Sequence, residues 1–136
     1  MSHCHICTML GAAAPEDVVS NGDQWSVVGL RDVPGMLMAF TNRHDSGVGS
    51  IPDRAAAELG PLVRALSAGL VASGDFERAS VIYLGDNAVH THFMVVGRPP
   101  GDSVILDNAP LLARFAHADR DRARAIVADV RAALST

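Results

Sequence analysis

The order of the sequence patterns predicts an α+β fold with a mainly antiparallel sheet, a central helix and a C-terminal helix. Three observations lead to this class. Short apolar, β-branched runs separated by turn residues recur along the chain, an apolar stripe at helical spacing interrupts them, and an amphipathic segment closes the sequence. The chain has 136 residues, enough to bury a core, and no linker or repeat divides it, so residues 1–136 are expected to form a single domain.

The first third of the chain is expected to contribute two strands. Residues 8–24 mix Ala, Pro, Asp, Asn and Gly, which indicates an irregular segment with room for one helical turn. The runs 25–30 and 36–41 are apolar and read as strands, and Pro34-Gly35 marks the turn between them. The second strand is expected to be largely buried and to end before His44.

The middle of the chain carries the expected central helix. It follows a Ser- and Gly-rich loop over 46–50 and begins near Pro52, and Ser73-Gly74-Asp75 ends it. Its apolar residues recur at helical spacing at Leu59, Leu62, Val63, Leu66, Leu70 and Val71. Pro61 lies inside this run and is expected to kink or split the helix, because it lacks a backbone N–H.

Two further strands and a helix complete the pattern. The strands are expected over 79–84 and 90–96, with a turn at Gly85-Asp86-Asn87 between them. Residues 119–134 form an amphipathic helix with its apolar residues on one side. Its arginines are interpreted as a solvated face rather than a binding patch.

Composition excludes several functional classes. The net charge is −4, and one Trp and one Tyr leave little for base stacking, so a nucleic-acid partner is not expected. No apolar run approaches the ~18 residues that span a membrane, and the start of the chain lacks the basic region of a signal peptide. A cytoplasmic location follows, where two cysteines are typically free thiols or metal ligands.

The segment from His90 to Pro99 is the most informative stretch of the chain. Because side chains alternate along a strand, His90, His92 and Met94 are expected on one face and Thr91 and Phe93 on the other. The two histidines then lie about 6.6–6.8 Å apart along the backbone. One of them could bind a metal while its neighbour performs chemistry; the alternative is a pair of half-buried spacer residues.

A Cys-x-x-Cys motif at Cys4 and Cys7 suggests a metal site, since tetrahedral zinc takes four Cys or His ligands. His44 ends one expected strand and His90 begins another, so the four side chains can meet at the margin of the sheet. Such a site would pin the N-terminus to the sheet. His3 and His5 flank the cysteines and could substitute as ligands, and free thiols with unrelated histidines are the alternative.

The sequence from Cys4 to about Pro99 resembles the histidine-triad (HIT) family of nucleotide-binding hydrolases and transferases. The segment from Gly85 to Val96, with its His-x-His-x-Met centre, is similar to the family pattern Gly-Gln-x-x-x-His-φ-His-φ-His-φ-φ. The stretch from Pro34-Gly35 to His44 is similar to the family segments Pro-Gly-His-φ and Pro-Lys-x-His. Some bacterial members bind structural zinc through an N-terminal Cys-x-x-Cys, and the resemblance then implies His44 and His90 as the other ligands. It also implies a homodimer.

By this resemblance His92 is the nucleophile, in hydrolysis or nucleotidyl transfer on nucleoside phosphates or dinucleoside polyphosphates. A neutral imidazole attacks phosphorus well, and a covalent nucleotidyl-histidine divides one difficult displacement into two. A backbone carbonyl that accepts one ring N–H would leave the other nitrogen for the α-phosphate. Gly85 would allow close approach of the phosphate, and the Asn87 amide could contact it.

Three departures from the family pattern bear on activity. Met94 occupies the third triad position, beside the phosphate or leaving group, and offers no hydrogen-bond donor. Asp86 replaces the family Gln and adds negative charge near a phosphate. Asp32 is the nearest candidate for the carboxylate that holds the ribose hydroxyls, and otherwise an ordinary turn residue. A nucleotide-binding or interaction module without catalysis is therefore the main alternative, and a catalytic three-ligand metal is another.

Overall fold

The computed structural model describes residues 4–85, 88–102 and 113–135. The five strands β1 to β5 form one sheet in the order β1-β2-β3-β5-β4, and every neighbouring pair is antiparallel. The strands are β1 (Val18–Asn21), β2 (Trp25–Gly29), β3 (Met36–Thr41), β4 (Arg78–Ile82) and β5 (His92–Arg98). The helices are α1 (His5–Ala12), α2 (Asp53–Ala72) and α4 (Arg120–Leu134), with short 3-10 turns η1 (Pro15–Asp17), η2 (Val48–Ser50) and η3 (Arg114–His117). The α+β class is confirmed.

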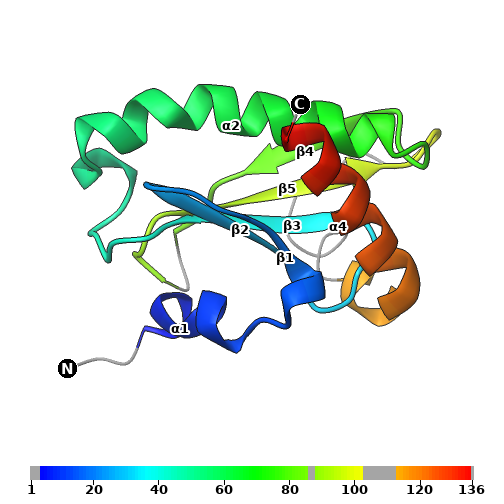
Figure 1. Ribbon diagram of the computed structural model, residues 1–136, viewed down its shortest axis with the longest axis horizontal. Coiled ribbons are helices and arrows are strands. Elements are labelled where there is room, and N and C mark those ends of the chain that lie inside the picture. Colours follow the sequence, from blue (N-terminus) through cyan, green and yellow to red (C-terminus); the bar gives the residue numbers. More distant parts are fainter. Residues whose placement is uncertain (1–3, 86–87, 103–112, 136) are drawn as a thin grey trace.

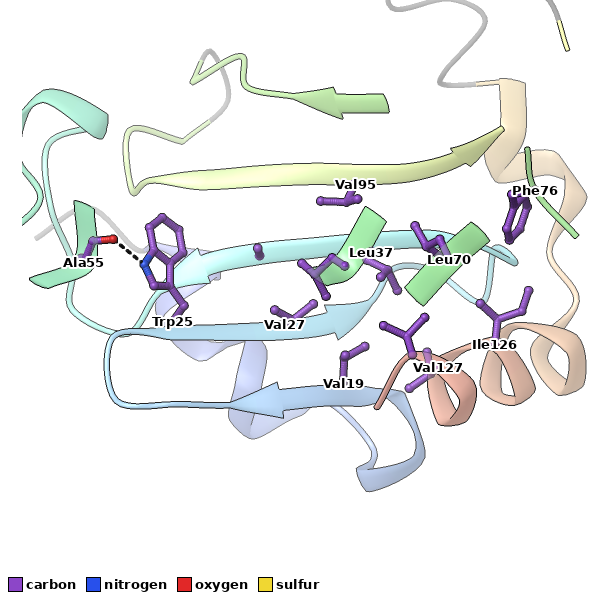
Figure 2. Packing of buried hydrophobic residues seen from close by; sticks show 13 residues of the cluster. Val19, Trp25, Val27, Leu37, Ala55, Leu70, Phe76, Val95, Ile126 and Val127 are labelled. Atoms are coloured by element: carbon purple, nitrogen blue, oxygen red, sulfur yellow. Dashed lines mark hydrogen bonds between the residues drawn. The ribbon is translucent and has the colours of Figure 1, made fainter. Parts of the chain in front are cut away.

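Helices α2 and α4 cover one face of the sheet, and α1 lies on the other (Figure 1). Between the sheet and the α2–α4 pair lies the larger apolar core, in which the side chains of Val27, Leu66 and Ile126 are fully buried. Trp25 belongs to this core, and its indole N–H donates a hydrogen bond to the Ala55 carbonyl at 2.9 Å (Figure 2). This core packs against one face of the sheet. Strands β3 and β5, which pair with each other, lead to the candidate functional residues.

Helix α1 is held against the opposite face by its own apolar residues. Ile6 is 1% exposed and packs in a second core with Val28, Met38 and Phe40. The helix has neither a side-chain N-cap nor an acidic residue in its first turn. Tertiary packing therefore stabilises α1 more than local sequence does, because an eight-residue helix is marginal in water by itself. This packing brings both cysteines to the sheet.

Strand β5 shows the alternation of faces that the sequence predicts. His92 pairs with Phe40 and Met94 with Met38, so both side chains lie on the α1 face, whereas Phe93 pairs with Ala39 and packs against the larger core. The strand begins at His92 and not at His90. The ladder ends here because the Thr91 amide donates to the Asp45 carboxylate, and the Thr41 carbonyl accepts from the His90 ring in place of a backbone amide.

The segment before Trp25 is more regular than its composition indicates. It contains α1, η1 and β1, and β1 pairs with β2 despite a register irregularity between Val18 and Ser20. A four-residue strand has too short a pattern to stand out in sequence; pairing with β2 stabilises it. Pro61 does not split α2, which runs through it as one helix. Pro61 has no N–H to donate to the Ala57 carbonyl. Ala57 is exposed, so water can donate to that carbonyl.

Helix α2 is long and apolar enough to meet a length-and-hydropathy test for a membrane span. It is the core helix of this fold: Ala55, Leu66 and Leu70 are buried against the sheet and α4. The α4 arginines, interpreted above as a solvated face, pair with carboxylates of the sheet and its loops, as in Arg120–Asp32 and Arg124–Asp17. These ion pairs hold the C-terminal helix in its register on the domain.

Candidate functional site

Four side chains from three distant segments converge where β3 ends and β5 begins. Their ligand atoms, the sulfurs of Cys4 and Cys7 and a ring nitrogen from His44 and His90, all lie within 4.8 Å of one another. Cys4 precedes α1, Cys7 lies in its first turn, and His44 follows β3. His90 is 1% exposed, Cys4 is half-buried and the other two are exposed, so the cluster sits at the surface with a buried floor.

The spacing of these four atoms fits a tetrahedral zinc ion. With Zn–S near 2.3 Å and Zn–N near 2.0–2.1 Å, two ligands of one tetrahedral zinc lie roughly 3.3–3.8 Å apart. The Nδ1 atom of His90 lies 3.5 Å from each cysteine sulfur, and Nδ1 of His44 lies 3.3 Å from the Cys7 sulfur. Two thiols and two imidazoles are also the donor set that zinc prefers. The cluster can therefore hold a metal.

The ring of His90 is oriented by its other nitrogen. Nε2 lies 2.6 Å from the Thr41 carbonyl oxygen. A carbonyl only accepts, so Nε2 carries the proton and donates it, and Nδ1 presents its lone pair to the cluster. Metal-binding histidines commonly donate their second N–H in this way, which holds the ring at the correct angle. Edge-to-face contacts with His44 and Phe40 fix the ring further.

The pKa of the Cys7 thiol depends on the charges that lie beside it. Desolvation of the sulfur, followed by the hydrogen bond and charge of Cys4 beside it, raises the pKa of the Cys7 thiol above its usual value. The Cys7 thiol therefore ionises less readily when nothing positive lies beside it. A divalent metal reverses this effect, because thiolates bind it as anions and release their protons.

His92 is linked to the cluster through the backbone of His90. Its Nδ1 lies 2.7 Å from the His90 carbonyl oxygen, so Nδ1–H donates, and in the neutral form of the ring Nε2 carries the free lone pair. The side chain is half-buried on the α1 face of the sheet. A single residue, His90, thus offers its ring to the metal cluster and its carbonyl to the neighbouring imidazole.

Asp45 was not singled out by sequence reasoning, yet it occupies the centre of the polar contacts beside the cluster. Its carboxylate accepts hydrogen bonds from the Thr41 hydroxyl at 2.7 Å, from the Thr91 hydroxyl and amide at 2.7 and 2.8 Å, and from the Gly47 amide at 3.0 Å. Burial opposes ionisation, but the hydrogen bonds from Thr41, Thr91 and Gly47 outweigh it and lower the pKa of Asp45. Its position directly after His44 was the available sequence signal.

The residues predicted to contact substrate are spread over the sheet. Gly85 follows β4 with a φ of 71°, a left-handed conformation that glycine adopts without strain. Asp86 and Asn87, whose roles were predicted from the family pattern, lie outside the described residues. Met94 is half-buried in the second apolar core, where it packs against Met38.

Asp32 lies at the other end of β3 from His92. Its carboxylate pairs with Arg120 at 3.2 Å, and its residue lines a small cavity on the α4 side. The strand from Met36 to Phe40, the partner of His92, spans roughly 13 Å. The structure therefore brings Cys4, Cys7, His44, His90 and His92 together and leaves Asp32 apart from them.

No protein-family model matches the sequence, and none of the curated proteins matches it. Solved structures do. A zinc-bound histidine triad family protein from Mycobacterium smegmatis is 18% identical with a TM-score of 0.70, over 97% of this chain and 93% of that one. A hypothetical histidine triad nucleotide-binding protein from Sulfolobus tokodaii is 14% identical with a TM-score of 0.69, over 97% and 92%. A uridylyltransferase is 20% identical with a TM-score of 0.67, and the match covers 97% of this chain but 45% of that one.

The fold is that of the histidine-triad proteins, which confirms the fold implied by the sequence resemblance. Within this fold the chain carries a Cys/His cluster that can hold a metal, beside a half-buried imidazole whose Nδ1–H donates to the His90 carbonyl.

Proposed function

We propose that the protein binds a structural zinc ion through Cys4, Cys7, His44 and His90 and acts on the phosphate of a nucleotide through His92. The observation that carries this proposal is the double use of His90: its Nδ1 faces the cysteines while its carbonyl accepts the Nδ1 proton of His92 at 2.7 Å. A zinc-bound histidine triad protein shares the fold, which supports the choice of metal. A cytoplasmic setting would keep both cysteines reduced and available as ligands.

The imidazole of His92 has the form that a nucleophile needs. With Nδ1–H on the His90 carbonyl, Nε2 attacks the α-phosphorus of a nucleotide; the N–P bond forms as the bond to the leaving group breaks. Water or another acceptor then attacks the same phosphorus, the N–P bond breaks, and the imidazole returns to its starting form. Attack by water gives hydrolysis, and attack by another acceptor gives nucleotidyl transfer. Zinc, when bound, holds the His90 segment in place.

A cavity on the same face of the sheet can accept the nucleoside. It has a volume of about 310 Å³ and lies between α1 and β2. Its lining is mostly apolar with Asp17 as its carboxylate, and consists of His5, Thr8, Met9, Ala12, Ala13, Asp17, Val28, Gly29 and Leu30. A volume near 300 Å³ is at the lower end of ligand pockets. Asp32 does not line this cavity but the small cavity on the α4 side. Its contact with the ribose therefore stays a prediction.

The phosphate would lie between this cavity and the loop after β4. Gly85, with its positive φ, would let the backbone approach the phosphate closely, and Asn87 is proposed to contact it. Met94 would face the leaving group. Since Met94 donates no hydrogen bond, the leaving group would take its proton from water or from the substrate itself.

Met94 also supports the second candidate function, a nucleotide-binding or interaction module without turnover. Its half-buried side chain packs against the apolar cluster that contains Met38, and it offers no hydrogen-bond donor to a substrate. A catalytic metal is less well supported, because four protein ligands close a tetrahedral site and leave no position for water.

The experiment that separates these functions is a turnover panel with a matched control. Wild type, His92→Ala and His117→Ala are incubated with adenosine phosphoramidates, dinucleoside polyphosphates and fluorescent mononucleotide conjugates. His117 is an exposed histidine of η3 and should leave activity unchanged. We expect turnover in wild type and His117→Ala, loss in His92→Ala by about 10⁴-fold or more, as for removal of a nucleophile, and a nucleotidyl adduct on the wild-type protein by mass spectrometry. Equal turnover in all three would refute catalysis by His92; calorimetric binding of AMP or GMP without turnover would identify the binding module.

We further propose a homodimer that uses the outer edge of β4. This strand is last in the sheet order, and no other described strand pairs with its free side. Exposed apolar side chains gather on β4 and the loops beside it: Val48, Val81, Tyr83, Leu84 and Val89 are 37–58% exposed. An unprotected apolar edge of this kind favours pairing with another strand. Val81→Lys should shift the protein to a monomer in light scattering, whereas Val71→Lys on α2, also an exposed valine, should not.

A further inference from the structure

Asp45 joins the two chain segments that supply the histidine half of the proposed metal site. It directly follows His44, and its carboxylate accepts the amide and hydroxyl hydrogens of Thr91, the residue between His90 and His92. Thr91 is fully buried and Thr41 is 2% exposed. Two buried hydroxyls and an amide therefore depend on this one carboxylate, because a buried polar group without a partner is costly.

The same contacts control the orientation of the His90 ring. The Thr41 hydroxyl donates to Asp45, and the Thr41 carbonyl accepts Nε2–H of His90 at 2.6 Å. The Thr41 amide in turn donates to the Thr91 carbonyl at 3.2 Å. Asp45 thus holds two residues on which His90 depends. Thr91 is its neighbour along the chain, and Thr41 supplies the carbonyl that accepts its ring proton.

We infer that Asp45 is a positioning residue that sets the geometry of His90, and through the His90 carbonyl selects the tautomer of His92. This inference rests on the proposed zinc site and nucleophile. Asp45 contacts neither the cluster atoms nor His92 itself; it acts by holding Thr41 and Thr91. The metal site and the imidazole then share one support, so a change at Asp45 affects the His90 ring and the His92 tautomer together.

The test compares Asp45→Asn with Asp129→Asn, the same change at an exposed residue of α4. Cobalt(II) serves as the probe, because its thiolate and ligand-field absorption reports both affinity and geometry. We expect Asp45→Asn to weaken cobalt binding by about 10- to 100-fold, the usual effect of losing an outer-shell partner. Asp129→Asn should bind cobalt as wild type does. Nitrogen NMR of the His92 ring should show the Nδ1–H tautomer in wild type and a mixture in Asp45→Asn.

Thr91→Val provides a second variant should Asp45→Asn fail to fold. It deletes one hydroxyl donor to Asp45 and keeps the branched shape, so we expect a loss of about two- to tenfold in cobalt affinity, the effect of one hydrogen bond. If the folded variants lose thermal stability but keep wild-type cobalt affinity and the His92 tautomer, Asp45 is structural only and the inference is wrong.

A Cys4→Ser/Cys7→Ser double variant separates this failure from failure of the proposed function. Loss of cobalt binding there, together with wild-type binding in Asp45→Asn and Thr91→Val, overturns the inference and leaves the metal site standing. Wild-type cobalt binding in the double variant overturns the metal site itself, and the inference with it.

Discussion

The two ends of β5 both carry polar side chains, but the groups are arranged in opposite ways. Before its first residue, two thiols and two imidazole nitrogens point at one another within 4.8 Å. At its last residue, Arg98 is 3% exposed; it donates to the Asp102 carboxylate at 2.6 Å and to the Ser80 hydroxyl at 3.0 Å. Arg114 also pairs with Asp102.

The difference distinguishes a site from a structural contact. At the Arg98 end, guanidinium groups donate to a carboxylate, so groups of opposite charge meet directly. At the His90 end, two thiols and two imidazole nitrogens converge, which is a donor set that tetrahedral zinc takes. Burial alone would not separate the two ends, because Arg98 and His90 are both buried.

Removing the cysteine half of the site should have the largest effect. Cys4→Ser/Cys7→Ser should contain almost no zinc, whereas wild type should contain about one ion per chain. At free zinc about a thousandfold above Kd, binding adds about 4 kcal/mol to stability, which is roughly 10–20 °C in Tm for a domain of this size. A chelator should lower the Tm of wild type and leave the double variant unchanged. Stoichiometric zinc in the double variant would show that the ligands are different.

Disrupting the Arg98 contacts at the end of β5 should destabilise the fold without affecting metal binding. Arg98→Met keeps most of the side-chain volume but leaves Asp102 with Arg114 as its remaining described ion-pair partner. We expect a loss of about 3 kcal/mol in the free energy of unfolding, as for a disrupted buried pair, measured by denaturant titration. Zinc content per folded chain should stay at the wild-type value. A fall in zinc content would mean that the two ends are not independent.

The stability that the Arg98–Asp102 pair contributes should depend on pH. The Arg98 hydrogen bond lowers the pKa of Asp102 despite the opposing effect of burial, and Arg114 lowers it further. Since the folded-state pKa is depressed, this stabilisation is present above the unfolded value near pH 4 and is lost as pH falls through the folded value. Asp102→Asn should therefore be about 1 kcal/mol less stable at pH 7, and the gap should narrow as pH falls below 4. Both proteins are measured with chelator, so that proton competition for zinc does not contribute; a gap that stays constant, or widens, as pH falls below 4 would contradict the assignment.

The smallest effect on stability is expected at His92, although it lies two residues from a proposed ligand. His92→Ala loses one hydrogen bond to the His90 carbonyl and should cost less than about 1 kcal/mol, with zinc content unchanged. His90→Ala should reduce zinc content sharply, because its Nδ1 faces both cysteines. Metal analysis and thermal unfolding of the two variants side by side check this. Equal zinc loss in both would place His92 among the ligands.

Much of the architecture was predictable from local pattern. Apolar runs marked β2 to β5, and the helical stripe marked α2, since each exceeds the length at which periodicity becomes visible. The short strand β1 and helix α1 were not predictable, because each depends on a partner: β1 on pairing with β2, and α1 on packing of Ile6 against the sheet. The start of β5 was placed two residues early, since nothing local distinguishes His90 from the strand that follows.

For the site, the sequence by itself determined the donor types and the alternation that separates His92 from Thr91 and Phe93, because both follow from residue identity and the two-residue period of a strand. Only the tertiary structure decided that Cys4, Cys7, His44 and His90 meet, that the Thr41 carbonyl orients the His90 ring, and that Asp45 holds Thr41 and Thr91. These contacts join residues up to 86 positions apart along the chain, and their partners are chosen by the packing of α1 and β3 against β5. A local pattern carries no information about such distances, whereas the folded sheet brings them within hydrogen-bond range.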